Sequence, residues 1–504
     1  MRRALLAGIL AAVLVLAAER VHGAFAWLAC APLGAASAAS AARCGRGRRW
    51  LEGLVAGSAF ALAVALVGES PWLTAVGRSY FGLSNARATV AASALAAGCA
   101  AWAGPVLGVA LWRAAALPGA LAVVGAAAIW SAWEGLLVIA PPSYPWVSLA
   151  ATQTDTPAAA QAASLGGAAL VSYLVALSGF AVGRALVARG PARAAGLAAA
   201  AAVALVTVVA GAWRLGSAGD RGGPPASVGA PVGGECRIAA VDASIEPAAA
   251  DLDSTAARYA DASERARARA PSLIVWPESA LVRDPRLDGE LRGRLQAWSR
   301  AWGAALLVGA PRFGWSADWV QQRFNAMVLV SGDAPLAAYD KRRPVPFAES
   351  WPIPWLARPS WLAVDDVTAG ERAGLVEARS CRVGVLVCFE AERPELAREL
   401  AAGGAAALVV ATNDAQLPPV AVAREVAQAR LRALETGLPV LRAANRGESV
   451  AIDRFGRIAA RAHDGITELT PTSAEPAPAV AWQGMAWAAI AIAAAVSFAG
   501  AGRR

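Results

Sequence analysis

The chain has 504 residues, which is more than one ordinary domain needs. It is 57% hydrophobic and only 16% charged, which excludes a wholly soluble protein of this length and indicates membrane spans. Its net charge of +9 rests mostly on scattered arginines rather than on a basic face interleaved with aromatic residues, so we expect no nucleic-acid partner. With two histidines and no CxxC pair, we also expect no metal and no cofactor.

The first 215 residues contain repeated apolar stretches, each close to the length of about 17 to 25 residues that crosses a bilayer. A further span is predicted near 481–500. The first stretch is alternatively a signal peptide, but no small-residue cleavage site precedes Arg20, so we expect a retained anchor. The predicted N-terminal spans are 4–19, 24–42, 51–68, 89–112, 115–139, 166–188 and 194–213.

Arginine placement predicts the orientation of these spans. With the N-terminus inside, the inner segments are rich in arginine, whereas the outer loop over 140–165 has no lysine or arginine. This asymmetry follows the positive-inside rule. Seven spans from an inside start then place the following polar segment outside the cytoplasm, and the last span returns the chain to the inside.

The polar segment is predicted to be a separate domain between two linkers. Within it, β-rich runs alternate with helical patterns, which predicts an α/β domain with a layered sheet. The predicted strands are "CRIAAVDA", "SLIVWPES", "ALLVGAPRF", "FNAMVLVSG", "CRVGVLVCFE", "ALVVATND", "PVLRAANRG" and "SVAIDRFGRI". The expected helices are 248–269, 286–303, 393–402 and 419–436. We expect a membrane domain over 1–215, a linker over 216–233, a catalytic domain over 234–470, and a C-terminal span with a basic tail over 479–504.

Two segments place charged groups at the ends of strand-like runs. In "LIVWPESAL", Pro277 ends the run and Glu278 follows it, where a carboxylate suits a general base; a helix N-cap is the alternative. In "YDKRRPVPFAES", Lys341 stands in a chain whose basic residues are nearly all arginine, and Glu349 follows a proline-stiffened segment. A solvated turn is the alternative there.

A third segment, "VGVLVCFEA", ends a strand-like run in Cys388. A thiol at a strand–helix turn faces backbone N–H groups, which stabilise a thiolate and a developing oxyanion. The alternative is a buried filler, the more usual fate of a lone cysteine. None of the three segments is decisive alone.

Together, and in this order, the three segments resemble the carbon–nitrogen hydrolase (nitrilase) superfamily over about residues 234–465. Asn325 in "RFNAMV" and the Asn-Asp pair of "ATNDA" add to the resemblance. It implies a nitrilase-like α-β-β-α sandwich attached to a polytopic α-helical membrane domain. It also implies a triad in which Glu278 is the base, Lys341 stabilises the tetrahedral intermediate and Cys388 is the nucleophile.

The predicted membrane spans narrow this resemblance to the apolipoprotein N-acyltransferase family, as does "KRRPVPFAES", in which Glu349 matches a second functional glutamate. The resemblance implies a multi-pass enzyme of the bacterial inner membrane. It would move an acyl chain from a phospholipid, through a thioester on Cys388, to the α-amine of a diacylglyceryl-cysteine of an apolipoprotein. We expect a monomer in contact with membrane lipid. A membrane-anchored amidase with the same triad is the alternative.

Further residues are expected to support the site. Trp351 and Trp355 lie in a proline-broken loop that we interpret as a lid at the membrane interface; an ordinary packed loop is the alternative. Phe389 stands where the family commonly has tyrosine, and Gln416 to Pro419 replace an aromatic-glycine pair. The other supporting candidates are Trp276, Glu390, Asn413 and Asp414.

Two features lie outside the predicted site. Cys236 and Cys381 each begin a "CR" strand, and a disulfide between them is one option in an oxidising compartment. Glu134 is an acidic residue within an apolar span, where ionisable residues are functional candidates, although hydration near the interface is the alternative.

Overall fold

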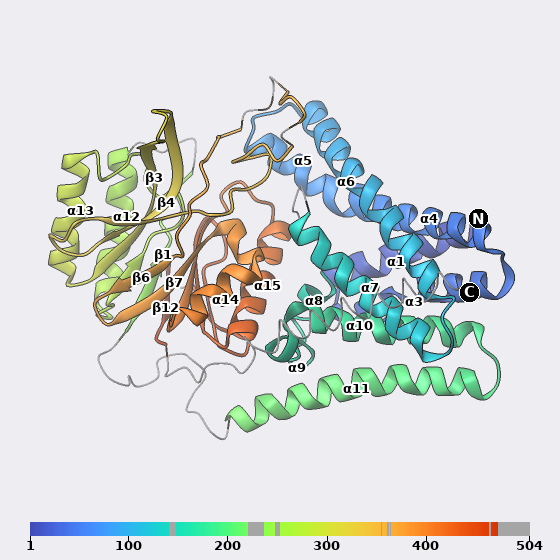
Figure 1. Ribbon diagram of the computed structural model, residues 1–504. Coiled ribbons are helices and arrows are strands. Elements are labelled where there is room, and N and C mark those ends of the chain that lie inside the picture. The colour runs from blue at the N-terminus through green and yellow to red at the C-terminus, as the bar shows by residue number, and fades with distance from the viewer. Residues whose placement is uncertain are drawn as a thin grey trace. The chain divides into compact units, whose positions relative to one another are not determined.

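The computed structural model describes residues 1–140, 148–219, 236–246, 252–353, 355–359, 362, 364–462 and 465–471. The predicted span near 481–500 and most of the predicted linker over 216–233 lie outside the described residues. The chain divides into two compact units, one within Met1–Gly216 and the other within Ser217–Val480 (Figure 1).

The first unit is helical, and six of its stretches are long and apolar enough to cross a membrane. These are Gly23–Arg43, Gly47–Ser79, Asn85–Ala114, Ala120–Ile139, Ala163–Val187 and Pro191–Ser217. Its helices are α1 (Arg2–Arg20), α2 (Ala26–Ala29), α3 (Ala31–Arg43), α4 (Arg46–Ala63), α5 (Ser70–Ser79), α6 (Asn85–Ala114), α7 (Ala120–Ile139), α8 (Leu149–Thr152), α9 (Pro157–Ala160), α10 (Ala163–Val187) and α11 (Pro191–Gly219).

The predicted count of seven apolar spans is not met in the described part of the chain. The first predicted span forms α1, but its 19 residues carry Arg2 and Arg3 at one end and Glu19 and Arg20 at the other. Because of these charges, the uncharged part of α1 is shorter than in the six stretches that are long and apolar enough to cross a membrane. The predicted span 51–68 is instead longer than expected, since a π-helical segment, Val64–Glu69, joins α4 directly to α5.

Glycine allows α4 and α6 to pack closely. A Cβ atom added at Gly57 would lie 2.0 Å from the carbonyl oxygen of Gly104, and one added at Gly108 would lie 2.0 Å from that of Gly53. Small residues of this kind let helix backbones approach each other within a membrane, where van der Waals packing rather than the hydrophobic effect drives association.

The second unit contains two six-stranded sheets, ordered β12-β1-β2-β3-β4-β5 and β11-β10-β9-β8-β7-β6. Both sheets are mixed: β1, β2 and β3 are parallel in one, β7, β8 and β9 are parallel in the other, and the outer strands pair antiparallel. The strands are β1 (Ile238–Val241), β2 (Leu273–Val275), β3 (Ala305–Trp315), β4 (Gln321–Val330), β5 (Ala337–Asp340), β6 (Leu375–Ala378), β7 (Cys381–Val387), β8 (Ala407–Asn413), β9 (Val440–Asn445), β10 (Val450–Ile452), β11 (Ile458–Arg461) and β12 (Ile466–Leu469).

Apolar side chains alternate along these strands and divide the core into layers. One face of each sheet packs against the other sheet through residues such as Val275, Leu307, Val385 and Val409. The opposite face of the first sheet packs under α12 (Leu252–Arg267) and α13 (Gly289–Trp302), and that of the second sheet packs under α14 (Pro394–Ala402) and α15 (Pro419–Thr436) (Figure 1). The predicted α-β-β-α sandwich is confirmed.

The strands that the sequence did not predict lie at the edges of the sheets. β5, β6 and β12 have four residues each, which is too short for a clear alternating pattern. β10 and β11 were expected as one strand, but a turn over Asp453–Arg457 separates them, held by hydrogen bonds from the backbone N–H groups of Phe455 and Arg457 to the Asp453 carboxylate.

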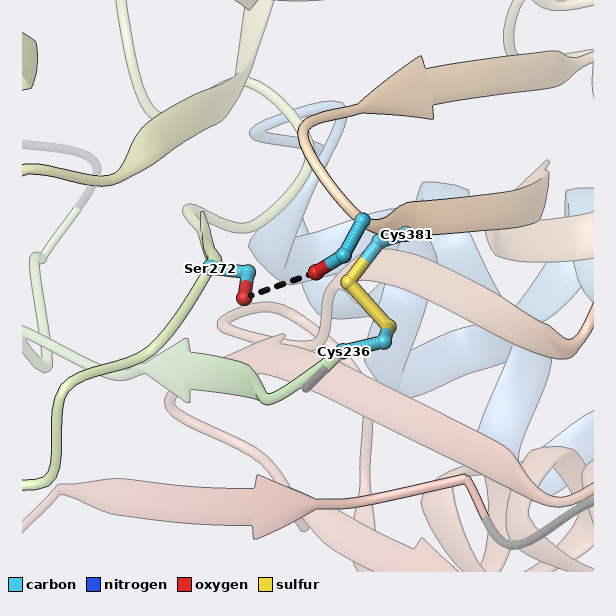
Figure 2. Close-up of a disulfide and its surroundings, with 4 residues drawn as sticks. Cys236, Ser272 and Cys381 are labelled. Carbon is cyan, nitrogen blue, oxygen red and sulfur yellow. Dashed lines mark hydrogen bonds between the residues drawn. A yellow bond between two sulfur atoms is a disulfide. The ribbon is translucent and has the colours of Figure 1, made fainter. Parts of the chain in front are cut away.

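A disulfide between Cys236 and Cys381 connects the two sheets (Figure 2). Cys236 lies just before β1 of the first sheet, and Cys381 begins β7 of the second. The two cysteines are 145 residues apart in the sequence. Beside the disulfide, the hydroxyl groups of Ser272 and Ser380 form a hydrogen bond of 3.4 Å. The pairing of Cys236 with Cys381, which was one option from the sequence, is therefore present in the structure.

We predict that loss of this bond destabilises the second unit. The double variant Cys236→Ser, Cys381→Ser should lose about 2–4 kcal/mol of stability, because the crosslink restricts the unfolded chain. Thermal unfolding in detergent measures the loss, and Cys44→Ser, at a free cysteine, is the matched control. Maleimide labelling of the denatured wild type should modify four of the six cysteines before reduction and all six after it; six before reduction would contradict the assignment.

Candidate active site

The predicted site residues follow strands from both sheets. Glu278 comes just after β2, Lys341 directly after β5, and Cys388 directly after β7, while Asn413 is the last residue of β8. The carboxyl ends of parallel strands meet at one edge of a sheet, and here the two sheets bring such edges together. A Cβ on Gly309 of β3 would lie 2.1 Å from the carbonyl oxygen of Pro277, so glycine allows the segment that carries Glu278 to lie close to β3.

Lys341 lies between two glutamates at the centre of the site. Its Nζ atom is 3.0 Å from Glu278 Oε1 and 2.8 Å from Glu349 Oε2, and all three side chains are buried. Asn325 on β4 donates hydrogen bonds of 2.7 Å to both glutamates, and the backbone N–H of Asn413 donates to Glu278 Oε2 at 3.1 Å. Glu278 is therefore held by donors from both sheets.

Electrostatics keep Lys341 and Glu349 charged. Burial acts to lower the pKa of Lys341, but the charges of Glu278 and Glu349 outweigh it and hold the pKa well above its ordinary value. Burial acts to raise the pKa of Glu349, yet the charge and hydrogen bond of Lys341 hold it below its ordinary value. At neutral pH, Lys341 is thus a buried ammonium group. Nζ has three N–H donors, and the two glutamates use two of them, which leaves one for a further acceptor.

Cys388 has a left-handed backbone, with a φ of +50°. Few residues other than glycine adopt this conformation, and it is often found at functional sites. It turns the chain sharply from β7 into a short 3-10 helix, Cys388–Glu392. The sulfur lies 3.8 Å from Glu425 Oε1 on α15, to which the thiol donates a hydrogen bond.

The surroundings of Cys388 favour a thiol rather than the thiolate that the sequence suggested. Burial raises the pKa of Cys388 well above its ordinary value, and the charges of Glu278 and Glu425 raise it further, while Lys341 acts against them. The helix predicted over 393–402 forms as α14 from Pro394, and the 3-10 helix Cys388–Glu392 separates it from β7. A reaction at this sulfur therefore needs a base to remove its proton.

Glu390 joins the Lys341 segment to the Cys388 turn. Its buried carboxylate accepts hydrogen bonds from the backbone N–H groups of Arg342 (2.6 Å), Arg343 (3.1 Å) and Val387 (2.8 Å), and from the hydroxyl group of Tyr339 (2.9 and 2.8 Å). The carboxylate thus fixes backbone groups next to both Lys341 and Cys388.

The Asn-Asp pair lies at the end of β8 and has two different surroundings. The side-chain oxygen of Asn413 accepts from Asn445 Nδ2 at 3.1 Å. Asp414 is buried and forms two hydrogen bonds with Arg442 of β9, at 2.8 and 2.9 Å. Arg442 also donates to Glu425 Oε2 at 2.8 Å, and so connects the pair to the residue that contacts Cys388.

Other predicted residues lie outside this cluster. Trp276 is buried under the outer helices, where it stacks on Tyr259 and donates to Ser263 Oγ. The Phe389 ring packs under the guanidinium group of Arg393, at 4.6 Å. Trp351 contacts Phe347 and donates to a backbone carbonyl oxygen, and Trp355 is 83% exposed.

Sequence reasoning missed Glu425 and Arg442. Both lie in segments that were predicted correctly, a helix over 419–436 and a strand in "PVLRAANRG". A signal was nevertheless present: an arginine inside an apolar strand needs a buried acidic partner, since an unpaired buried charge is very costly. Within the described residues, no group of three histidine, cysteine or acidic side chains has a geometry that could hold a metal ion.

Glu134 in the first unit is bound entirely to its neighbours. Its carboxylate accepts from Trp130 Nε1 (2.7 Å), the backbone N–H of Leu149 (3.0 Å), Ser172 Oγ (2.6 Å) and Ser148 Oγ (3.4 Å). It therefore joins α7, α8 and α10, which is a structural role.

Comparison with known proteins gives matches over both units. Residues 237–473 match the carbon-nitrogen hydrolase family, and residues 10–181 match the apolipoprotein N-acyltransferase N-terminal domain. The apolipoprotein N-acyltransferase of Geobacter metallireducens is 30% identical over 62% of this chain and 61% of its own, and that of Azotobacter vinelandii is 31% identical over 66% and 64%. The matched part thus spans somewhat less than two thirds of these relatives. Among solved structures, an amidase from Nesterenkonia sp. is 21% identical, with 51% of this chain and 96% of its own covered and a TM-score of 0.36.

The long apolar helices, the two six-stranded sheets and the match to carbon-nitrogen hydrolases together define a multi-pass membrane protein that carries a nitrilase-type α/β domain. The N-terminal match and these two relatives make the chain similar to apolipoprotein N-acyltransferases, at 30–31% identity over 62–66% of its length.

We predict that Glu390 is important for stability. Glu390→Ala should lower the free energy of unfolding by about 3 kcal/mol, because several buried donors lose their acceptor, whereas Tyr339→Phe should cost only about 1 kcal/mol. Thermal unfolding in detergent gives both values. Glu377→Ala, at a 73% exposed side chain, is the control and should change stability by less than about 0.5 kcal/mol. Equal losses for Glu390→Ala and Tyr339→Phe would contradict this role.

Proposed function

We propose that this protein transfers an acyl chain from a membrane phospholipid to the α-amine of the N-terminal diacylglyceryl-cysteine of apolipoproteins. The observation that carries the proposal is the buried Glu278–Lys341 pair beside Cys388, in a chain whose helical unit matches the N-terminal domain of apolipoprotein N-acyltransferases. A nucleophile, a carboxylate and a fixed ammonium group are what acyl transfer through a thioester requires.

In the first half-reaction, Cys388 Sγ attacks the carbonyl carbon of a phospholipid ester. Glu278 takes the thiol proton, and the remaining donor of Lys341 stabilises the oxyanion of the tetrahedral intermediate. The C–O bond then breaks, the proton passes to the leaving oxygen, and lysophospholipid departs. The acyl chain remains on sulfur as a thioester.

In the second half-reaction, the lipoprotein α-amine attacks the thioester carbon. Glu278 takes a proton from the amine, the C–S bond breaks, and the proton returns to the sulfur, so that an amide and the resting thiol are formed. Both substrates are lipids, which accounts for the attachment of a nitrilase-type domain to membrane helices. The exposed Trp355 and Leu356 offer side chains suited to contact with lipid near the site.

We further propose that the catalytic domain lies outside the cytoplasm. The Cys236–Cys381 disulfide supports this, because such bonds persist in oxidising compartments and are rare in the cytosol. The orientation requires an odd number of crossings before the domain. α1 would supply the seventh: 19 helical residues are about 28 Å long, and its alanine-rich face is buried within the helical unit.

A direct assay tests the activity. Purified full-length protein, incubated with phospholipid and a synthetic diacylated lipopeptide, should add one acyl chain to the peptide and release lysophospholipid, both visible by mass spectrometry. Cys388→Ala should lower the rate by more than about a thousandfold, since the thioester cannot form. Cys44→Ala, at a free cysteine outside the catalytic unit, is the control.

The intermediate offers a second readout. Without acceptor, wild-type protein should carry one acyl group that neutral hydroxylamine releases. Lys341 is the only lysine of the chain, so few amines compete for the label. Full activity of Cys388→Ala would refute the triad, and release of free fatty acid or ammonia without an acylated peptide would indicate the amidase instead.

The orientation has its own test. In intact spheroplasts, a membrane-impermeant maleimide should label a Glu377→Cys variant, whose position is 73% exposed. Gly45→Cys, in the arginine-rich connection between α3 and α4, should be labelled only after permeabilisation; a Cβ there has open space around it. Labelling of the second variant alone in intact spheroplasts would reverse the proposed topology.

A further inference from the structure

We propose that Glu425 is a further residue of the active site, which accepts the hydrogen bond of the resting Cys388 thiol and keeps the sulfur protonated until an acyl donor enters. The inference rests on the proposed role of Cys388 as the nucleophile. Its starting point is the 3.8 Å contact between Cys388 Sγ and Glu425 Oε1.

The position of Glu425 is fixed by groups on two strands. Its Oε2 atom accepts a hydrogen bond from Arg442 Nη2 of β9 at 2.8 Å and lies 3.3 Å from Thr412 Oγ1 of β8, whose single hydroxyl proton is shared between Glu425 and Asp414 Oδ1 at 3.0 Å. These donors hold one carboxylate oxygen, and the other is the oxygen that faces the sulfur. The side chain is only 14% exposed, so the arrangement is largely shielded from water.

Glu425 is not needed merely to neutralise Arg442. Asp414 already pairs with that guanidinium group through two hydrogen bonds, at 2.8 and 2.9 Å. Glu425 adds a second carboxyl group to one arginine; burial raises the pKa of Glu425, and the charge of Arg442 acts against this rise. Lys341 likewise contacts two carboxyl groups, those of Glu278 and Glu349. Carboxyl groups from both clusters act on Cys388, and they disfavour a thiolate there.

The charged groups around both residues have a consistent effect. Those facing Cys388 are Glu278, Lys341, Glu349 and Glu425, and three of these four are acidic. Those facing Glu425 are Arg442, Asp414, Glu278 and Glu392. Glu425 acts to raise the pKa of Cys388, so its removal should lower that pKa. A protonated resting thiol reacts slowly with adventitious electrophiles and oxidants, because the thiolate is the reactive form.

The test measures alkylation of Cys388 by iodoacetamide over a range of pH, in full-length protein purified in detergent without acyl donor. Mass spectrometry of the peptide that carries Cys388 separates it from the other free cysteines, and Cys388 is partly exposed and so open to the reagent. Glu425→Gln keeps the size of the side chain but removes its charge. We expect its alkylation midpoint about one pH unit below that of the wild type, and about tenfold faster alkylation at neutral pH.

Two variants separate this role from a structural one. Thr412→Val removes a hydroxyl group that contacts Glu425 and Asp414 without changing charge, and Glu377→Gln removes a 73% exposed carboxylate on β6 whose ionic partner is Arg382. Both should keep the wild-type midpoint. An unshifted Glu425→Gln profile, or the same shift in Thr412→Val, would overturn the inference. Alkylation needs neither lipid substrate. A failed acyl-transfer assay would therefore contradict the proposed function without deciding the role of Glu425.

Discussion

The buried ammonium group of Lys341 is the constraint on which the site depends. A charge without solvent is costly unless opposite charges and hydrogen bonds compensate for it, and removal of one partner leaves the other unpaired. Glu278 and Glu349 provide that compensation, and Asn325 holds both glutamates. The cluster joins the ends of β2 and β5 and the segment after β5, so the same contacts fix the geometry of the candidate site and the local fold.

The positions of Glu278, Lys341 and Cys388 were predicted from the resemblance of three motifs, in their order, to the carbon–nitrogen hydrolase superfamily, since each motif alone left a structural alternative open. In the structure the three residues follow β2, β5 and β7, and the carboxyl ends of strands that run in one direction meet at one edge of a sheet. The structure places the two charged residues in contact and Cys388 within their electrostatic reach. Lys341 is the only lysine in the chain, which sharpens the argument that an arginine would not serve there.

What the sequence could not show depends on packing between distant elements. The contact of Glu425 with Cys388 requires α15 to lie over the Cys388 turn, and no local pattern encodes that distance. Likewise, Trp276 was expected to support the site, but its side chain faces the outer helices, where it stacks on Tyr259 and donates to Ser263. Short edge strands were missed because pairing with a longer neighbour, rather than their own composition, makes them strands.

The pairing of β1 with β12 has a consequence for how this architecture is assembled. Ile238, at the start of the catalytic sandwich, lies opposite Leu469, near its end, in one antiparallel ladder. The chain therefore enters and leaves the sandwich at adjacent points, as in domains that tolerate insertion into a host protein. A self-contained sandwich with adjacent ends can be placed in a loop of another protein without distorting either part, because each part then keeps its own core.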